Sequence, residues 1–110
     1  MKALSRLNLF ENLPENSARE HFQTLYQNRR VRVERIVSRG HASPEDFWYD
    51  QDEHEFVVMM RGHAGLILEG ASGEVRLQAG DCLLIPAHCR HRVAWTAPEQ
   101  DTIWLAVHFR

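Results

Sequence analysis

The feature that most restricts the fold of this chain is a series of short strand-like segments from Val31 almost to the end. In the first segment Val31, Val33 and Val37 recur with a period of two, which is typical of a β-strand. Glycine or proline turns separate the segments, and no helical pattern lies between them to connect parallel strands. This series predicts an all-β sandwich or barrel. The expected strands are residues 31–38, 47–51, 55–61, 64–68, 74–78, 82–85, 92–96 and 102–109.

Residues 1–30 do not share this pattern. The first fifteen include the apolar side chains Leu4, Leu7, Leu9, Phe10 and Leu13. We expect this arm to lie on the domain or on a partner subunit. Ser17 and Glu20 fit a capping box, and Asn28 fits a helix end. Ala18, Phe22, Leu25 and Tyr26 would share one face of that helix. The prediction is an N-terminal arm and short helix (residues 1–30) packed on a β-barrel (residues 31–110).

Composition and charge narrow the class of protein. A chain of 110 residues fits one domain, and a net charge of −2 gives no general affinity for nucleic acid or an anionic membrane. No apolar run is as long as a membrane span, and no signal-peptide pattern is recognisable. Two cysteines, Cys82 and Cys89, do not make a disulfide framework and fit a reducing compartment. We expect a cytoplasmic protein without nucleic-acid or membrane partners.

The stretch from Gly80 to Trp95 is typical of a strand, a loop and a second strand. Gly80 begins a turn, residues 82–85 form a short apolar run, and Pro86 ends it because proline cannot donate to a ladder. His88 and His91 follow in the loop, just before the next strand. Such a unit can direct an imidazole into the interior of a barrel.

This stretch resembles the second motif of the cupin family, G-x5-P-x-G-x2-H-x3-N. Gly80, Pro86 and His91 stand at the glycine, proline and metal-binding histidine of that motif. His88 stands at its second glycine and Trp95 at its asparagine. The resemblance extends over roughly residues 31–109 and implies a small single-domain cupin. The fold of that family is a double-stranded β-helix, or jelly-roll barrel, in agreement with the strand pattern.

The first cupin motif, H-x-H-x3-E-x6-G, fits residues 49–62. Glu55 and Gly62 match its glutamate and closing glycine, whereas Tyr49 and Gln51 occupy its two histidine positions. The resemblance then implies that Tyr49, Gln51, Glu55 and His91 converge in the mouth of the barrel. A divalent metal such as Fe, Mn, Ni or Zn would be held by His91, Gln51 and Glu55. The alternative is an interior hydrogen-bonded pair of His91 and Glu55 with a water between them.

Further residues are candidates for the same site. Glu55 and His88 are the candidates for moving a proton in catalysis. Arg90 either binds an anionic ligand at the rim or makes surface ion pairs, and His108 is either an interior group near the site or a satisfied core histidine. The expected ligand pocket consists of Tyr49, Gln51, Met59, Trp95, His108 and Arg90.

Three functions remain open from the sequence. The first is a metal-dependent enzyme on a small molecule, for which the resemblance implies dioxygenase, isomerase or decarboxylase chemistry. The second is a ligand-binding or sensing cupin without metal or catalysis, which the loss of both histidines of the first motif favours. The third is a structural dimer component whose pocket is filled by Tyr49, Met59 and Trp95. In each case we expect a homodimer, because the apolar arm and the last strand can cover sheet edges across a two-fold axis.

Overall fold

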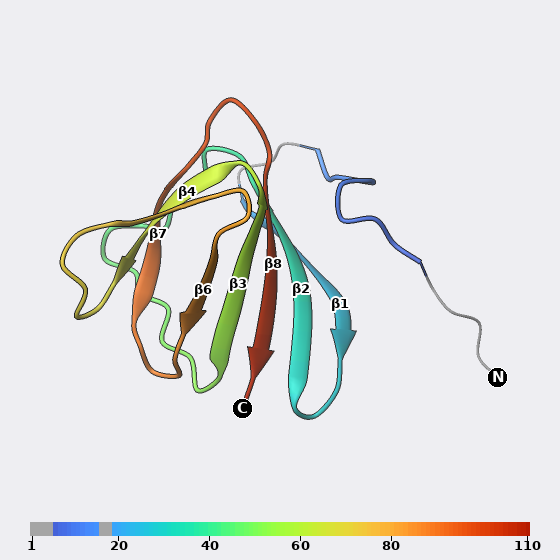
Figure 1. The fold of residues 1–110 in the computed structure, drawn as a ribbon. Coiled ribbons are helices and arrows are strands. Elements are labelled where there is room, and N and C mark those ends of the chain that lie inside the picture. The colour runs from blue at the N-terminus through green and yellow to red at the C-terminus, as the bar shows by residue number, and fades with distance from the viewer. Residues whose placement is uncertain (1–5, 16–18) are drawn as a thin grey trace.

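The computed structural model describes residues 6–15 and 19–110, and its regular elements there are all strands (Figure 1). The eight strands are β1 (His21–Gln27), β2 (Val31–Ser38), β3 (His54–Arg61), β4 (His63–Leu68), β5 (Val75–Gln78), β6 (Cys82–Ile85), β7 (His91–Thr96) and β8 (Thr102–Phe109). The all-β prediction is confirmed. The bounds of β2, β6 and β8 coincide with predicted strands. Alternation marks β2, whereas short apolar stretches between turns mark β6 and β8.

The strands form two antiparallel sheets. One has five strands in the order β1-β2-β8-β3-β6, and the other has three in the order β5-β4-β7. Figure 1 shows the first sheet as a fan, with β4 and β7 of the second sheet beside it. The last strand, β8, lies between β2 and β3, so the end of the chain is at the centre of the larger sheet. From β3 onward the chain crosses repeatedly between the sheets, as expected for a jelly-roll arrangement.

The predicted N-terminal helix is wrong, because residues 21–27 form the edge strand β1. This strand pairs with β2, and the register places Phe22 opposite Ile36 and Tyr26 opposite Val33. A register shift between Thr24 and Tyr26 marks a β-bulge, which turns Phe22 and Tyr26 to opposite faces of the sheet. Pairing with the edge of β2 therefore determines the conformation of residues 21–27, although their local pattern favours a helix. The predicted capping residue Ser17 and the predicted helix-face residue Ala18, like Leu4 of the arm, lie outside the described residues.

The core lies between the two sheets. Alternate residues of facing strands point inward, so each strand contributes every second side chain to it. Met59 at the centre of β3 is fully buried. The buried cluster consists of Ile36, Val57, Met59, Ala64, Leu66, Leu77, Ile85, Val93, Trp104 and Ala106.

The described part of the arm is bound to the larger sheet through one buried arginine. Arg35 of β2 is 2% exposed and donates hydrogen bonds to the carbonyls of Leu9, Glu11 and Asn12, at 3.3, 2.7 and 3.1 Å. Phe10 lies under the guanidinium of Arg61, with its ring centroid 4.6 Å from the guanidinium carbon.

Within the described ranges, no helix has the length and apolarity needed to cross a bilayer.

Candidate functional site

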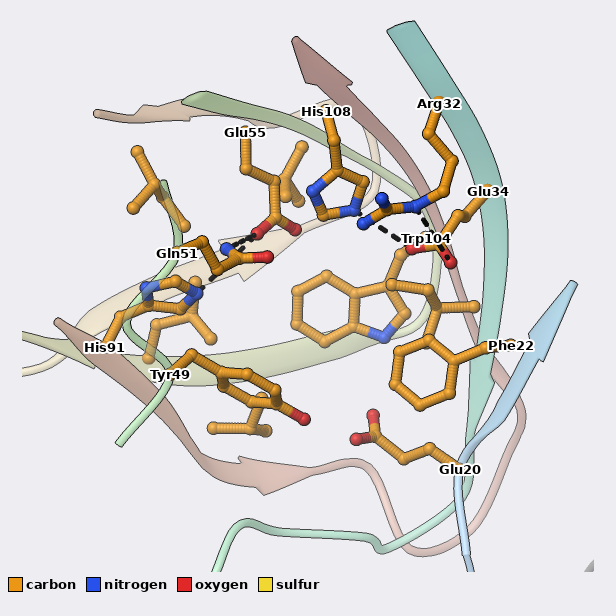
Figure 2. Close-up of a pocket in the computed structure, with 15 residues that line it drawn as sticks. Glu20, Phe22, Arg32, Glu34, Tyr49, Gln51, Glu55, His91, Trp104 and His108 are labelled. Carbon is orange, nitrogen blue, oxygen red and sulfur yellow. Dashed lines mark hydrogen bonds and ion pairs between the residues drawn. The ribbon is translucent and has the colours of Figure 1, made fainter. Parts of the chain in front are cut away.

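A cavity of about 230 Å³ lies between the two sheets (Figure 2). Its wall combines apolar core residues with an unusual number of ionisable groups. The lining residues are Glu20, Phe22, Arg32, Glu34, Ile36, Tyr49, Gln51, Glu55, Val57, Leu66, Ile85, His91, Val93, Trp104 and His108. An apolar cavity with a few convergent polar groups is the usual anatomy of a small-molecule site.

The structure brings together the four residues that the two motifs predict to converge. Tyr49 and His91 form an isolated β-bridge, with N–H to carbonyl distances of 2.7 and 3.1 Å in the two directions. Their rings stack with centroids 5.4 Å apart. Residues 47–51 therefore make one bridge rather than the predicted strand. Glu55 lies on the inward face of β3, and Gln51 precedes that strand. All four side chains line the cavity.

Glu55 and His91 form a buried pair. Their Oε1 and Nε2 atoms are 3.6 Å apart, and the Gln51 amide donates a 2.9 Å hydrogen bond to the same carboxylate oxygen. Nδ1 of His91 lies 3.0 Å from the Cys89 carbonyl. Because a carbonyl only accepts, Nδ1 carries a hydrogen and Nε2 is the atom that gains or loses a proton. The titrating nitrogen of His91 thus faces Glu55 and the cavity.

The two members of this pair stabilise each other's charged forms. Burial raises the pKa of Glu55, but hydrogen bonds from His91 and Gln51 outweigh it and hold the pKa below its ordinary value. Burial likewise lowers the pKa of His91, but the hydrogen bonds to Glu55 and to the Cys89 carbonyl outweigh it and raise the pKa. The pair is therefore biased toward a carboxylate beside an imidazolium.

A second histidine–glutamate pair, which the sequence did not reveal, lies on another wall. Nε2 of His108 is 2.9 Å from Oε1 of Glu34. Arg32 contacts Glu34 at 3.6 Å and Glu53 at 3.3 Å. The inward position of Glu34 follows from alternation with Ile36 on β2. Sequence alone does not tell which face of β2 meets the core, because valines occupy the other face.

The open end of the cavity is aromatic and also acidic. Phe22, Tyr49 and Trp104 lie there with the Glu20 carboxylate (Figure 2). Ser38 connects Glu20 with Trp104. Its hydroxyl donates a hydrogen bond to the Glu20 carboxylate and accepts a 3.2 Å hydrogen bond from the Trp104 indole. Burial raises the pKa of Tyr49, and the nearby carboxylates, Glu20 first, raise it further. Sequence reasoning missed Glu20 and Phe22 because it placed both on a helix.

Four predicted site residues lie outside the lining of the cavity. Met59 is fully buried in the core. The Trp95 indole donates to Glu74 on the outer side of the smaller sheet, because a register shift at Gly65 breaks the alternation that would have placed it with His91. Arg90 binds Glu69 through two contacts of 2.8 and 2.7 Å, and the exposed His88 binds Asp50. Met59 and Trp95 therefore do not fill the cavity, whereas His108 does line it.

The donor set of the cavity does not favour a metal. In the described residues, no group of three or more His, Cys, Asp or Glu side chains has the arrangement needed to hold an ion. Of the three predicted ligands, Gln51 would have to coordinate the ion through its amide oxygen. Its amide nitrogen is already hydrogen-bonded to the Glu55 carboxylate, so the amide is oriented toward Glu55. The raised pKa of Tyr49 also keeps its phenol protonated, and a protonated phenol is a weak ligand. A metal at these residues stays a prediction, and no chemical step is derived through it.

Comparison with known proteins identifies relatives of the chain. The family model described as "Cupin domain" matches residues 34–108. The crystal structure of a "putative mannose-6-phosphate isomerase" from Ralstonia eutropha JMP134 is 44% identical, with a TM-score of 0.93 over 96% of this chain and 98% of that one. A protein of Thermus thermophilus (TM-score 0.78, 96% and 97% covered) and a cupin superfamily protein of Desulfitobacterium hafniense (0.71, 88% and 83%) are each 15% identical and share the fold. No curated protein matches the chain.

Proposed function

The chain belongs to the cupin family, and from that premise we propose that it is a small-molecule enzyme of the isomerase type, with His91 and Glu55 as its proton-transfer groups. The observation that carries the proposal is their buried pair, 3.6 Å apart on the wall of a 230 Å³ cavity. Ion pairs of this kind inside a cavity are candidates for function, because burial and charge together shift both pKa values.

The pair supplies the two groups that a proton shift beside a carbonyl needs. The Glu55 carboxylate removes a proton from the carbon next to the carbonyl, while the His91 imidazolium donates its Nε2 proton to the carbonyl oxygen. The resulting enol collapses in the other direction when His91 takes a hydroxyl proton and Glu55 returns its proton to the neighbouring carbon. No electron is gained or lost overall, so the reaction requires no co-reactant.

Two observations favour isomerisation over the other cupin chemistries. The relative from Ralstonia eutropha, 44% identical over nearly its whole length, is named for an isomerase. Dioxygenase chemistry requires a site for a metal or another oxygen-activating group, and the donor set described above does not favour a metal. Proton transfer by His91 and Glu55 uses groups that are already in contact.

The test is exchange of substrate hydrogen with solvent. The protein is incubated in D₂O with mannose or mannose 6-phosphate, and proton NMR follows loss of the signal from the carbon next to the carbonyl. We expect exchange that falls about 100-fold or more in His91→Gln and in Glu55→Gln. His63→Gln changes a histidine on the smaller sheet that does not line the cavity and serves as the matched control. Exchange that persists in both cavity variants would disprove the assignment.

The second candidate is a ligand-binding cupin without turnover. The contacts of the Glu55 carboxylate favour it. Gln51 and His91 already contact this carboxylate, so it is less available to remove a proton from a substrate. The two candidates differ in one outcome, because a bound molecule that shows neither exchange nor conversion supports binding alone. Elemental analysis of untagged protein and of His91→Ala addresses the metal directly: near-stoichiometric metal that is lost in the variant would establish a metal site.

A further inference from the structure

The cavity has two chemically different ends. Figure 2 shows Glu55, Gln51 and His91 at one end, and the Glu20 carboxylate, the Phe22 ring and the Tyr49 hydroxyl at the other, with the Trp104 indole beside them. Phe22 is 50% exposed although it lines the cavity, so the aromatic end is the mouth. A ligand that enters passes the aromatic rings and Glu20 before it meets the proton-transfer pair.

The charged groups of the lining do not balance. The lining residues include three glutamates, Glu20, Glu34 and Glu55, and one arginine, Arg32. With His91 as the imidazolium that its pairing with Glu55 favours, and with His108 neutral, the sum is 3 negative minus 2 positive, or one negative charge. The guanidinium of Arg32 already contacts the carboxylates of Glu34 and Glu53. An anionic group at the mouth would meet the Glu20 carboxylate, and like charge at short range opposes binding.

We propose that the mouth of the cavity is a subsite for a small organic cation, in which Glu20 pairs with a ligand ammonium group and Phe22, Tyr49 and Trp104 present their rings to it. Aromatic faces attract cations through their quadrupoles, and a nearby carboxylate adds direct charge attraction. This inference rests on the proposed small-molecule site. It specifies a substrate that carries an amino group, rather than the phosphate in the name of the Ralstonia relative.

A separate observation is an unpaired polar atom on a residue that lines the same cavity. His108 lines the wall and is 4% exposed, and its Nδ1 has no hydrogen-bond partner among the described residues. Buried polar atoms are nearly always paired, and an unpaired one is satisfied when a bound water or a polar ligand group reaches it. In Figure 2 His108 lies between Glu55 and Glu34, on the wall across the Trp104 indole from Glu20. A ligand with an ammonium group at one end and polar groups beyond it matches this sequence of contacts.

The experiment compares three probes of similar size by isothermal titration calorimetry at low salt. Choline carries a quaternary ammonium group, 3,3-dimethylbutan-1-ol is its neutral isostere, and inorganic phosphate is the anion. We expect choline to bind at least about 10-fold more tightly than the neutral isostere. Glu20→Gln keeps the shape but removes the charge, and should abolish this preference. Glu99→Gln makes the same change on an exposed carboxylate that does not line the cavity and should leave the preference intact.

The outcomes separate clearly. Equal affinity of wild-type protein for choline and its isostere, no choline binding at millimolar concentration, or tighter binding of phosphate would each overturn the inference. The wild-type comparison needs no variant, so it remains decisive if Glu20→Gln fails to fold. Failure here leaves the deuterium-exchange test of His91 and Glu55 unaffected. Conversely, a choline preference without any exchange in an amino sugar such as mannosamine, tested beside mannose, would support the subsite and reject the proposed isomerisation.

Discussion

The two faces of the five-stranded sheet differ from the usual pattern, because the inner face carries charged residues and the outer face carries exposed apolar ones. The face toward the smaller sheet carries Glu34, Glu55 and His108 beside its core residues. The opposite face carries an uncharged row that crosses all five strands in register. This row consists of Tyr26, Val33, Val107, Phe56 and Leu84. The same strands thus bury charge on the inner face and expose apolar surface on the outer one.

The difference lies in how each face treats its residues: the inner face pairs its charges around the cavity, whereas the outer face leaves apolar side chains exposed. Buried carboxylates are costly unless paired, and Glu34 and Glu55 each have a histidine partner. On the outer row, Tyr26, Phe56 and Leu84 are 57%, 39% and 52% exposed. Continuous exposed apolar surface of this kind marks an interface. We propose that a second copy covers it, because a flat row without charge can face itself across a two-fold axis.

The largest effect is expected from two adjacent methionines on opposite faces of β3. Met59 is fully buried between the sheets, whereas Met60 is only partly buried. Met59→Ala should lower the free energy of unfolding by about 2–5 kcal/mol, since it leaves a cavity in a packed core. Met60→Ala should cost less than about 1 kcal/mol. Urea denaturation of both variants measures the difference, and equal losses would contradict the assignment of the two faces.

The next effect concerns the outer row and the association of two copies. Leu84→Glu places a charge within the proposed interface and should raise the dimer dissociation constant at least about 100-fold, equivalent to ~2.8 kcal/mol. Gln78→Glu adds the same charge to an exposed position on the smaller sheet and should have no effect. Sedimentation equilibrium at micromolar concentration measures the constant. Monomeric wild-type protein, or a Leu84→Glu variant that dimerises normally, would refute the interface.

A third prediction uses the pH dependence of the inner pair. The lowered pKa of Glu55 gives a stabilisation that is complete above the ordinary value of 4.5 and is lost as pH falls through the lowered pKa. The raised pKa of His91 gives one that is complete below 6.5 and is lost as pH rises through the raised pKa. The pair therefore stabilises most between these two values.

Glu55→Gln should accordingly cost about 1–3 kcal/mol within that window, and less at about pH 3 and about pH 9. Denaturation curves for wild type and variant across this range give the difference directly. Glu69→Gln, which removes an exposed carboxylate paired with Arg90, should show a small difference without a maximum. A Glu55→Gln cost that does not change with pH would mean that the two groups are not coupled.

The sequence predicted the outline of this fold and one end of the site. Alternation made β2 recognisable, an apolar stretch after a polar loop did so for β8, and the motif spacing placed Tyr49, Glu55 and His91 together. It could not place Glu34, because both faces of β2 carry residues that suit burial. Prediction failed where a bulge interrupts alternation. The register shift near Thr24 gives β1 an apolar spacing that resembles that of a helix. The shift at Gly65 places Trp95 on the face of β7 away from the cavity.

The smallest effect concerns Arg35, a charged residue on the otherwise largely apolar outer face. Arg35 is buried there because the arm covers it, and its guanidinium holds three arm carbonyls at 2.7–3.3 Å. Lysine cannot reproduce this forked geometry, so Arg35→Lys should cost about 1 kcal/mol and speed limited proteolysis within residues 6–15. Arg39→Lys, in an exposed arginine that binds Asp101 instead, is the control. Unchanged cleavage of the arm in Arg35→Lys would mean that contacts other than those of the guanidinium hold the arm. Arg35 would then be buried because the arm lies over it, and it would not be what keeps the arm in place.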